Sequence, residues 1–159
     1  MPVLNIAMVG SDELAKEIAK PTDQRDVHTY VHKENGPEGA RILSLIRPAK
    51  YPERLRPFLN ALSAARVGII EVTAVDGTLG EALVAFASSK ILRGIAIINS
   101  SDGTWIDEDQ VKMLFKQAGL GEWIFATKDG IELRTQLYDF MDDIKQELND
   151  ASASPLVIP

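Results

Sequence analysis

Two short apolar runs on either side of an alanine-rich segment constrain the fold of this chain more than any other feature. The runs are 67–73 and 95–98, and the segment between them has the apolar spacing of a helix. Neither run alternates regularly with polar residues, which is typical of strands that are covered on both faces in a parallel sheet. We therefore expect a strand–helix–strand unit. The polar residues 99–102 follow its second strand at the carboxyl end, where open α/β sheets place their ligand crevice.

The remaining apolar runs extend this unit into a layered domain. Further strands are predicted at 3–9, 27–31, 40–46 and 123–127, and further helices at 11–19, 57–65, 107–118 and 131–148. A turn with two glycines joins the second and third of these strands, so we expect them to form an antiparallel hairpin at the sheet edge. The order of elements predicts an α/β fold: a three-layer, doubly wound domain with a mixed sheet, one antiparallel edge strand and helices on both faces.

Composition limits the class of protein. The 159 residues fit one domain, which we place at 1–150, followed by a linker at 151–159. The absence of cysteine excludes a disulfide framework and a thiolate metal site. A net charge of -6 argues against a nucleic-acid binder that uses its whole surface. No apolar run has the length of a membrane span and the N-terminus leads straight into a strand, so we expect a cytoplasmic protein with no membrane partner.

The first strand–helix turn is the natural place for a phosphate-binding loop, and the sequence there keeps only part of one. Gly10 and Lys16 have the spacing of the loop Gly-x-x-x-x-Gly-Lys-Ser/Thr. However, Ala15 replaces the second glycine, and Glu17 replaces the hydroxyl that binds magnesium. The intervening residues also include two carboxylates, which repel phosphate oxygens. We therefore predict a capped surface helix here rather than a working phosphate loop.

The order of elements and the spacing of these remnants together resemble the G domain of the translational GTPases, in particular elongation factor Tu and the selenocysteine-specific elongation factor with its archaeal relatives. The resemblance covers nearly the whole chain and is clearest in 64–77 and 92–102. Asn99 and Asp102 match the ends of the family's Asn-Lys-x-Asp motif, whose aspartate reads the guanine base, although Ser100 replaces the lysine. The resemblance implies a P-loop GTPase-like fold. The nucleotide contacts that it implies are Asn99, Asp102, Lys16, Gly10, Ala126 and Thr127.

The departures from this family predict the loss of GTP hydrolysis. Arg47 stands where the family has the aspartate that holds magnesium through water, and Tyr51 where it has the histidine that positions the hydrolytic water. With Glu17, both usual supports for magnesium are missing, and phosphoryl transfer depends on such cations. The chain is therefore interpreted as a degenerate, nucleotide-independent G domain, in which Asn99 persists because its side chain ties loops together. No cofactor is expected unless guanine recognition survives, in which case GTP or GDP with magnesium would bind.

A basic stretch offers a second candidate site. The segment 47–57 carries Arg47, Lys50, Arg54 and Arg56, against Glu53 alone. One interpretation is a solvated loop and helix face. The other is an RNA-contact site, in which phosphate contacts with tRNA or the ribosome replace the lost nucleotide and the affinity falls steeply with salt.

Two further pairs of residues carry weaker signals. His28 and His32 share one face of a predicted strand, but a zinc site needs three or four ligands, so we expect surface histidines with no metal. Trp105 and Trp123 border loops near the carboxyl ends of strands, and packing is the expected role of both.

Three functions stay open at this point. The first is an interaction module: the G-domain-like part of an elongation-factor-like translation protein that acts on tRNA or the ribosome without hydrolysing GTP. The resemblance implies that β-barrel domains follow such a module, and the apolar segment 156–158 fits the start of one. The second is a translational GTPase with weak guanine recognition through Asn99 and Asp102. The third is a receiver-like or flavodoxin-like domain of the same architecture, and the lack of an acidic pair at the end of the first strand argues against the receiver.

Overall fold

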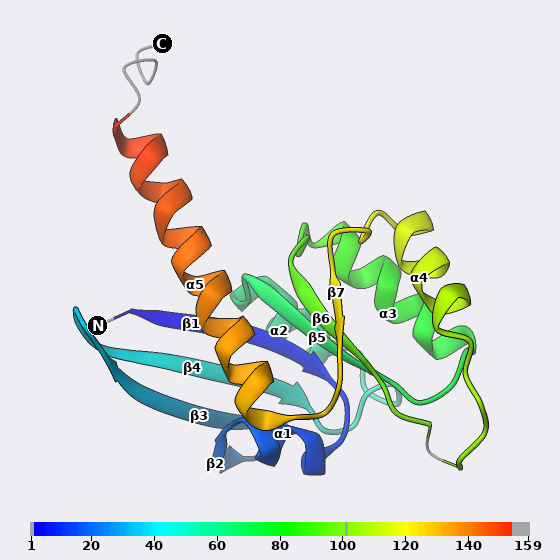
Figure 1. Ribbon diagram of the computed structural model, residues 1–159. Coiled ribbons are helices and arrows are strands. Elements are labelled where there is room, and N and C mark those ends of the chain that lie inside the picture. Colours follow the sequence, from blue (N-terminus) through cyan, green and yellow to red (C-terminus); the bar gives the residue numbers. More distant parts are fainter. Residues whose placement is uncertain (1, 101, 154–159) are drawn as a thin grey trace.

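Seven strands form one sheet in the computed structural model, which describes residues 2–100 and 102–153 (Figure 1). The strand order across the sheet is β2-β3-β4-β1-β5-β6-β7. The strands are β1 Val3–Val9, β2 Lys20–Gln24, β3 Val27–Gly36, β4 Gly39–Pro48, β5 Val67–Val72, β6 Gly94–Ile98 and β7 Ile124–Ala126.

One strand, β3, runs against the other six, so the antiparallel pairs lie at one edge of the sheet. The neighbours β4, β1, β5, β6 and β7 form parallel pairs, whereas β3 is antiparallel to both β4 and β2. The mixed sheet with an antiparallel edge is therefore confirmed. The outermost strand is nevertheless β2, which was not predicted. It is polar and exposed throughout and contains Pro21, so it lacks an apolar pattern; proline is tolerated on an edge strand because one side of that strand makes no ladder.

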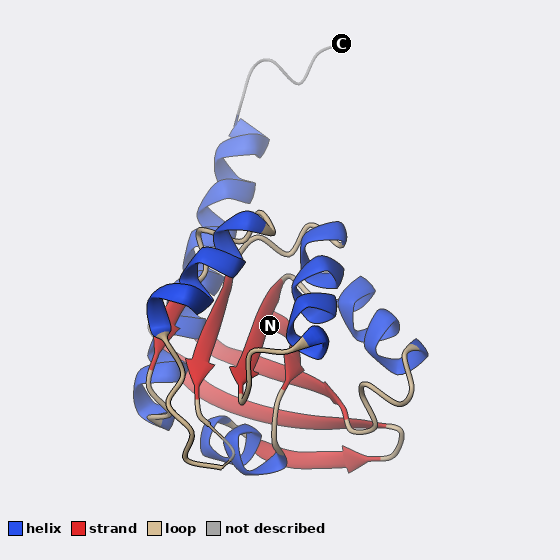
Figure 2. Ribbon diagram, turned by 90° about the vertical axis from the view of Figure 1, so that its right-hand side faces the viewer, coloured by secondary structure: helices blue, strands red, loops and turns tan. Residues whose placement is uncertain are grey.

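The helices cover both faces of this sheet (Figure 2). Helices α1 and α5 pack on one face, and α2, α3 and α4 pack on the other. The helices are α1 Asp12–Ile18, α2 Arg56–Ala64, α3 Gly77–Ser88, α4 Glu108–Gln117 and α5 Gly130–Ala153. This is the three-layer, P-loop GTPase-like arrangement that the sequence predicts.

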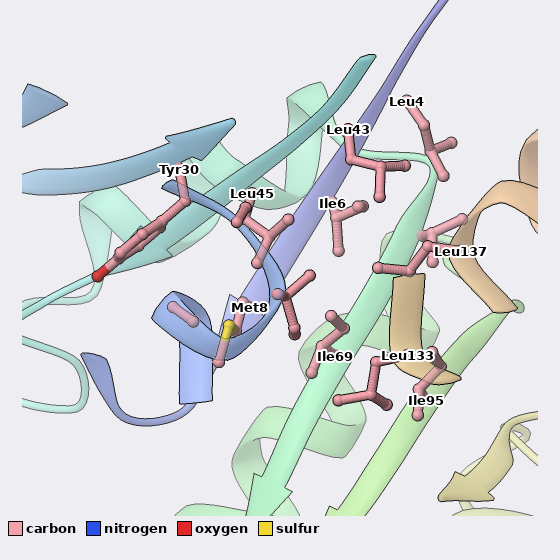
Figure 3. Packing of buried hydrophobic residues seen from close by; sticks show 14 of the residues in the cluster. Leu4, Ile6, Met8, Tyr30, Leu43, Leu45, Ile69, Ile95, Leu133 and Leu137 are labelled. Carbon is pink, nitrogen blue, oxygen red and sulfur yellow. The ribbon is translucent and has the colours of Figure 1, made fainter. Parts of the chain in front are cut away.

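The core on the first face joins strands from the centre of the sheet to α5 (Figure 3). Alternate residues of β1 point to this face, whereas Ala7 between them belongs to the other core, as the period of a strand requires. The labelled side chains of this core are Leu4, Ile6, Met8, Tyr30, Leu43, Leu45, Ile69, Ile95, Leu133 and Leu137.

Aromatic rings dominate the core on the second face. The buried Trp123 ring contacts Phe86 and Phe115, with centroid separations of 5.1 Å and 5.6 Å, and its Nε1–H donates to the Ile91 carbonyl. The indole lies directly over a glycine of β6: a Cβ atom at Gly94 would be 2.5 Å from the ring. Only glycine leaves room for the ring at this position.

The last helix is longer than predicted. It continues beyond the end of the sheet (Figure 1) and reaches Ala153, so the first three residues of the predicted linker at 151–159 are helical. The apolar segment 156–158 lies outside the described residues. Within the part of the chain that is described, no helix combines the length and the apolarity needed to cross a membrane.

Candidate functional site

The chain turns from β1 into α1 with only two residues between the strand and the helix. Strand β1 ends at Val9 and α1 begins at Asp12, because the Ser11 hydroxyl accepts from the Leu14 N–H at 3.1 Å and caps the helix. Lys16 therefore lies within α1, where its Nζ pairs with the Asp12 carboxylate at 2.8 Å. The segment 10–18 is a two-residue turn and a seven-residue helix, not a loop that wraps a phosphate.

A buried carboxylate lies beside this turn. Glu71 near the end of β5 is 7% exposed, and its Oε1 accepts from the Ser11 N–H at 2.8 Å. Its Oε2 accepts from Nδ2 of Asn99, just after β6, at 2.6 Å. The carboxylate thus joins the ends of β1, β5 and β6. The Asn99 side chain therefore joins the start of the loop after β6 to strand β5.

Arg47 at the end of β4 fills the other side of the turn. Its guanidinium is buried and donates from Nε to the Tyr30 hydroxyl at 3.0 Å and from Nη1 to the Gly10 carbonyl at 3.2 Å. Its Nη2 donates to Nδ1 of His28 at 2.9 Å, which fixes that nitrogen as an acceptor because arginine has no acceptor atoms. The Tyr30 hydroxyl in turn donates to Oδ1 of Asp12 at 2.6 Å. We call the four side chains of Asp12, His28, Tyr30 and Arg47 the Arg47 network.

Charge is balanced within the Arg47 network. Asp12 lies 4.0 Å from the guanidinium of Arg47, and hydrogen bonds from Lys16 and then Tyr30 lower the pKa of its carboxyl group. Burial, followed by the Asp12 carboxylate, raises the pKa of the Tyr30 hydroxyl. The network therefore carries an arginine and a carboxylate of opposite charge beside the turn from β1 into α1.

The residues predicted to read a guanine base have separate partners. Asn99 bonds to Glu71, whereas Asp102 is exposed and accepts through Oδ1 from the Ser100 hydroxyl at 3.0 Å and from the Thr104 N–H at 2.9 Å. These bonds, Thr104 first, lower the pKa of Asp102. Asp102 also lines a pocket of about 330 Å³ together with the loop after β5.

The other predicted nucleotide contacts lie at the ends of elements. Ala126 is the last residue of β7 and pairs with Ile97 of β6. Thr127 is exposed, and its carbonyl accepts from the Asp129 N–H in the turn before α5. The structure thus places Gly10, Asn99 and Ala126 at the carboxyl ends of parallel strands, with Glu71 between the first two.

The predicted basic site divides into a buried and an exposed part. Arg47 is 8% exposed and belongs to the Arg47 network, so it does not share a surface with Lys50, Arg54 and Arg56, which are exposed. Arg54 also pairs with Asp26 at 3.4 Å. Tyr51, in the place of the family's histidine, packs on Phe58 with a centroid separation of 4.4 Å, and burial raises its pKa.

Three of the four residues with weaker signals differ from their predictions. His28 and His32 are half-buried rather than surface histidines: His28 bonds to Arg47, and His32 Nδ1 lies 3.0 Å from the Tyr138 hydroxyl. Among the described residues no three side chains of the metal-binding types come together. Trp123 packs in the core as predicted, but Trp105 is 81% exposed, so packing is not its role.

Sequence reasoning missed Glu71 and Tyr30. Glu71 is a single charged residue within an otherwise apolar buried strand, and a buried charge requires partners. Tyr30 alternates with the two histidines along β3 and is fully buried. Both signals were visible, but neither identified a partner, because those partners are distant in the sequence.

The comparisons with known proteins give one distant relative. No family model matches the chain. An uncharacterized protein of Methanocaldococcus jannaschii is 22% identical over 157 residues, a match that covers 98% of this chain and 48% of the relative. The chain therefore spans about half the length of the curated relative that it matches.

Proposed function

We propose that this chain is the G-domain-like module of an elongation-factor-like translation protein that binds tRNA or the ribosome without hydrolysing GTP. The Glu71 bridge from the Ser11 N–H to the Asn99 amide carries the proposal. In a GTPase these two positions face the nucleotide, one at the phosphates and the other at the base. A carboxylate between them satisfies both groups internally and repels phosphate.

The Arg47 network supports the same proposal at the metal position. A GTPase needs anionic or hydroxyl ligands there to hold magnesium against the phosphates. This chain places a buried guanidinium instead, and Asp12 already pairs with Lys16 at 2.8 Å and bonds to Tyr30 at 2.6 Å. Loading magnesium would require breaking those contacts beside a fixed positive charge.

The exposed basic residues Lys50, Arg54 and Arg56 are the candidate RNA contacts. They lie between β4 and the first turn of α2, and all three side chains reach solvent. Lysine and arginine on a surface bind nucleic acid by releasing counterions from phosphate, so the affinity depends on salt. On a domain of net charge -6, such a local group would direct RNA to one face.

Fluorescence anisotropy with unfractionated tRNA tests this assignment. The triple variant Lys50→Ala, Arg54→Ala, Arg56→Ala is expected to lose at least about tenfold in affinity and to reduce the salt slope by about 3, near one unit for each lost contact. A variant with the exposed Lys90, Lys116 and Lys128 replaced by alanine removes the same charge elsewhere and should keep both values closer to wild type. An affinity that does not depend on salt would contradict the RNA role.

The second candidate is a GTP-binding translational GTPase with weak guanine recognition. It is favoured by Asp102, whose exposed carboxylate is ionised, lines a pocket and matches the base-reading aspartate of the family motif. This candidate requires Asn99 to leave Glu71 and turn to the base. Nucleotide binding would therefore break the 2.6 Å hydrogen bond that the structure contains.

A further inference from the structure

We propose that the surface around Trp105 is a docking site for an arginine-bearing segment of a protein partner. This inference goes beyond the proposed function: it uses a different surface from Lys50, Arg54 and Arg56 and does not depend on whether RNA binds there. Trp105 is 81% exposed, the largest exposed fraction of any large apolar side chain in the described residues. Tryptophan is enriched at protein interfaces, because its ring offers a large apolar area together with an N–H donor.

Trp105 lies at the rim of a built concavity rather than on a convex loop. The pocket has a volume of about 330 Å³ and lies between the loop after β5 and the loop from β6 to α4. Its walls combine the apolar groups of Val75 and Ile106 with the polar groups of Thr73, Asp102 and Gln110. Val75 is itself 40% exposed, so the apolar surface continues from the indole into the pocket.

The charge of the pocket selects the partner. Its lining residues include two carboxylates, Asp102 and Asp107, and no lysine or arginine. The Asp107 side chain caps α4 by accepting from the Asp109 N–H. Asp102 accepts through Oδ1 from the Ser100 hydroxyl and the Thr104 N–H, so its Oδ2 can accept from a ligand.

A guanidinium matches this combination of groups. Arginine stacks on the face of an indole and donates to a carboxylate with the same planar group, whereas a lysine ammonium is a point charge with stronger hydration. The phosphates of a nucleic acid would be repelled by the carboxylates of Asp102 and Asp107, so base stacking on Trp105 is disfavoured. The arrangement therefore selects a basic polypeptide rather than RNA.

NMR of the ¹⁵N-labelled whole chain tests the inference directly. The chain has two tryptophans, and the Nε1–H of the buried Trp123, bonded to Ile91, is an internal reference. Titration with the peptide acetyl-Gly-Arg-Gly-Arg-Gly-amide is expected to shift the Trp105 indole peak in a saturable manner and to leave the Trp123 peak in place. The same peptide with lysine should bind at least about threefold more weakly.

Variants separate the specific site from general attraction. Trp105→Leu is expected to weaken arginine-peptide binding by about tenfold and Asp102→Asn by about threefold or more. Asp143→Asn changes the same charge at an exposed position on α5 and should leave the affinity unchanged. Equal affinity of the peptide for wild type and Trp105→Leu, or no shift of the Trp105 peak at about 5 mM peptide, would overturn the proposal. A ten-residue oligothymidine that shifts the Trp105 peak at lower concentration than the peptide would also overturn it.

Discussion

The carboxylate of Glu71 accepts a hydrogen bond from the side-chain amide of Asn99 at 2.6 Å, at the carboxyl end of the parallel strands. The donor is Nδ2 of Asn99, because an amide nitrogen donates hydrogen bonds and does not accept them. The same carboxylate accepts from the Ser11 N–H at the end of β1. Glu71 therefore links the ends of three strands, and the contribution of this link to the stability of the domain can be measured.

Glu71→Leu is expected to lower the free energy of unfolding by about 1–3 kcal/mol. Leucine fills a similar space but accepts no hydrogen bond, so the Ser11 N–H and the Asn99 amide both lose their acceptor. Urea denaturation followed by circular dichroism measures the change. Glu53→Leu, at an exposed position, should change stability by less than about 0.5 kcal/mol. Equal stability of the two variants would show that the bridge contributes nothing.

Tyr30→Phe is expected to destabilise the domain by about 1–3 kcal/mol, because the buried Nε of Arg47 loses its acceptor. The ring itself stays in the core. Tyr51→Phe is the matched control: its ring packs on Phe58, and among the described residues its hydroxyl makes no hydrogen bond. Unfolding in urea compares the two, and a Tyr30→Phe protein as stable as Tyr51→Phe would argue against a closed network around Arg47.

Stability is expected to fall as the pH drops below about 6.5, and His32 should account for part of this loss. Burial and then the Arg134 guanidinium lower the pKa of His32 below its value of 6.5, against the opposing effect of Glu34. The unfolded state therefore binds more protons near that pH, so stability is complete above 6.5 and decreases as the pH falls through the lower folded-state pKa.

Urea denaturation between about pH 7.5 and pH 5 measures this dependence, in a range where the shifted carboxyl groups of Asp12, Glu38 and Asp102 stay ionised because their pKa values are lowered. His32→Asn keeps a polar group opposite the Tyr138 hydroxyl but does not titrate. Its stability should change less with pH than that of wild type. Parallel curves for the two proteins would exclude His32 as the source.

Gly94→Ala is expected to cost at least about 1–3 kcal/mol, because the new methyl group would lie 2.5 Å from the Trp123 ring and the ring is held by Phe86, Phe115 and the Ile91 carbonyl. Thermal unfolding and near-ultraviolet circular dichroism of the tryptophan report the effect. Gly121→Ala is the control, since its methyl group would be 3.7 Å from the nearest atom, in Lys116. A Gly94→Ala protein with wild-type stability would mean that the indole can move away at no cost.

The layers of this fold could be predicted because buried parallel strands are apolar along their whole length. The runs 67–73 and 95–98 became β5 and β6, which are neighbours in the parallel part of the sheet. Strand β2 could not be predicted in the same way: its five residues are all exposed, and an edge strand is held by backbone hydrogen bonds that leave no apolar pattern. Helix α5 continued past its predicted end because Asn149 to Ala153 contain no proline or glycine to stop it.

The candidate site was predictable by position but not by contact. The sequence located the turn at Gly10 and the motif at Asn99, and both lie at the carboxyl ends of parallel strands. It could not predict that Glu71 joins them. It also could not predict that Arg47 is buried, because a basic residue close to other basic residues in the sequence is expected to be exposed. Partners 28 or 60 residues apart become visible only when the sheet brings its strands together.

The central claim is that Glu71 occupies the space between the Ser11 N–H and the Asn99 amide, so that the chain does not bind guanine nucleotide. Isothermal titration calorimetry of the whole chain with GDP and with GTP, each with magnesium, tests it most directly. The account predicts no heat of binding at nucleotide concentrations of about 1 mM, both for wild type and for Asp102→Ala. Binding with a Kd near about 1 µM that is lost in Asp102→Ala would contradict it, because Asn99 must then leave Glu71 to read the base.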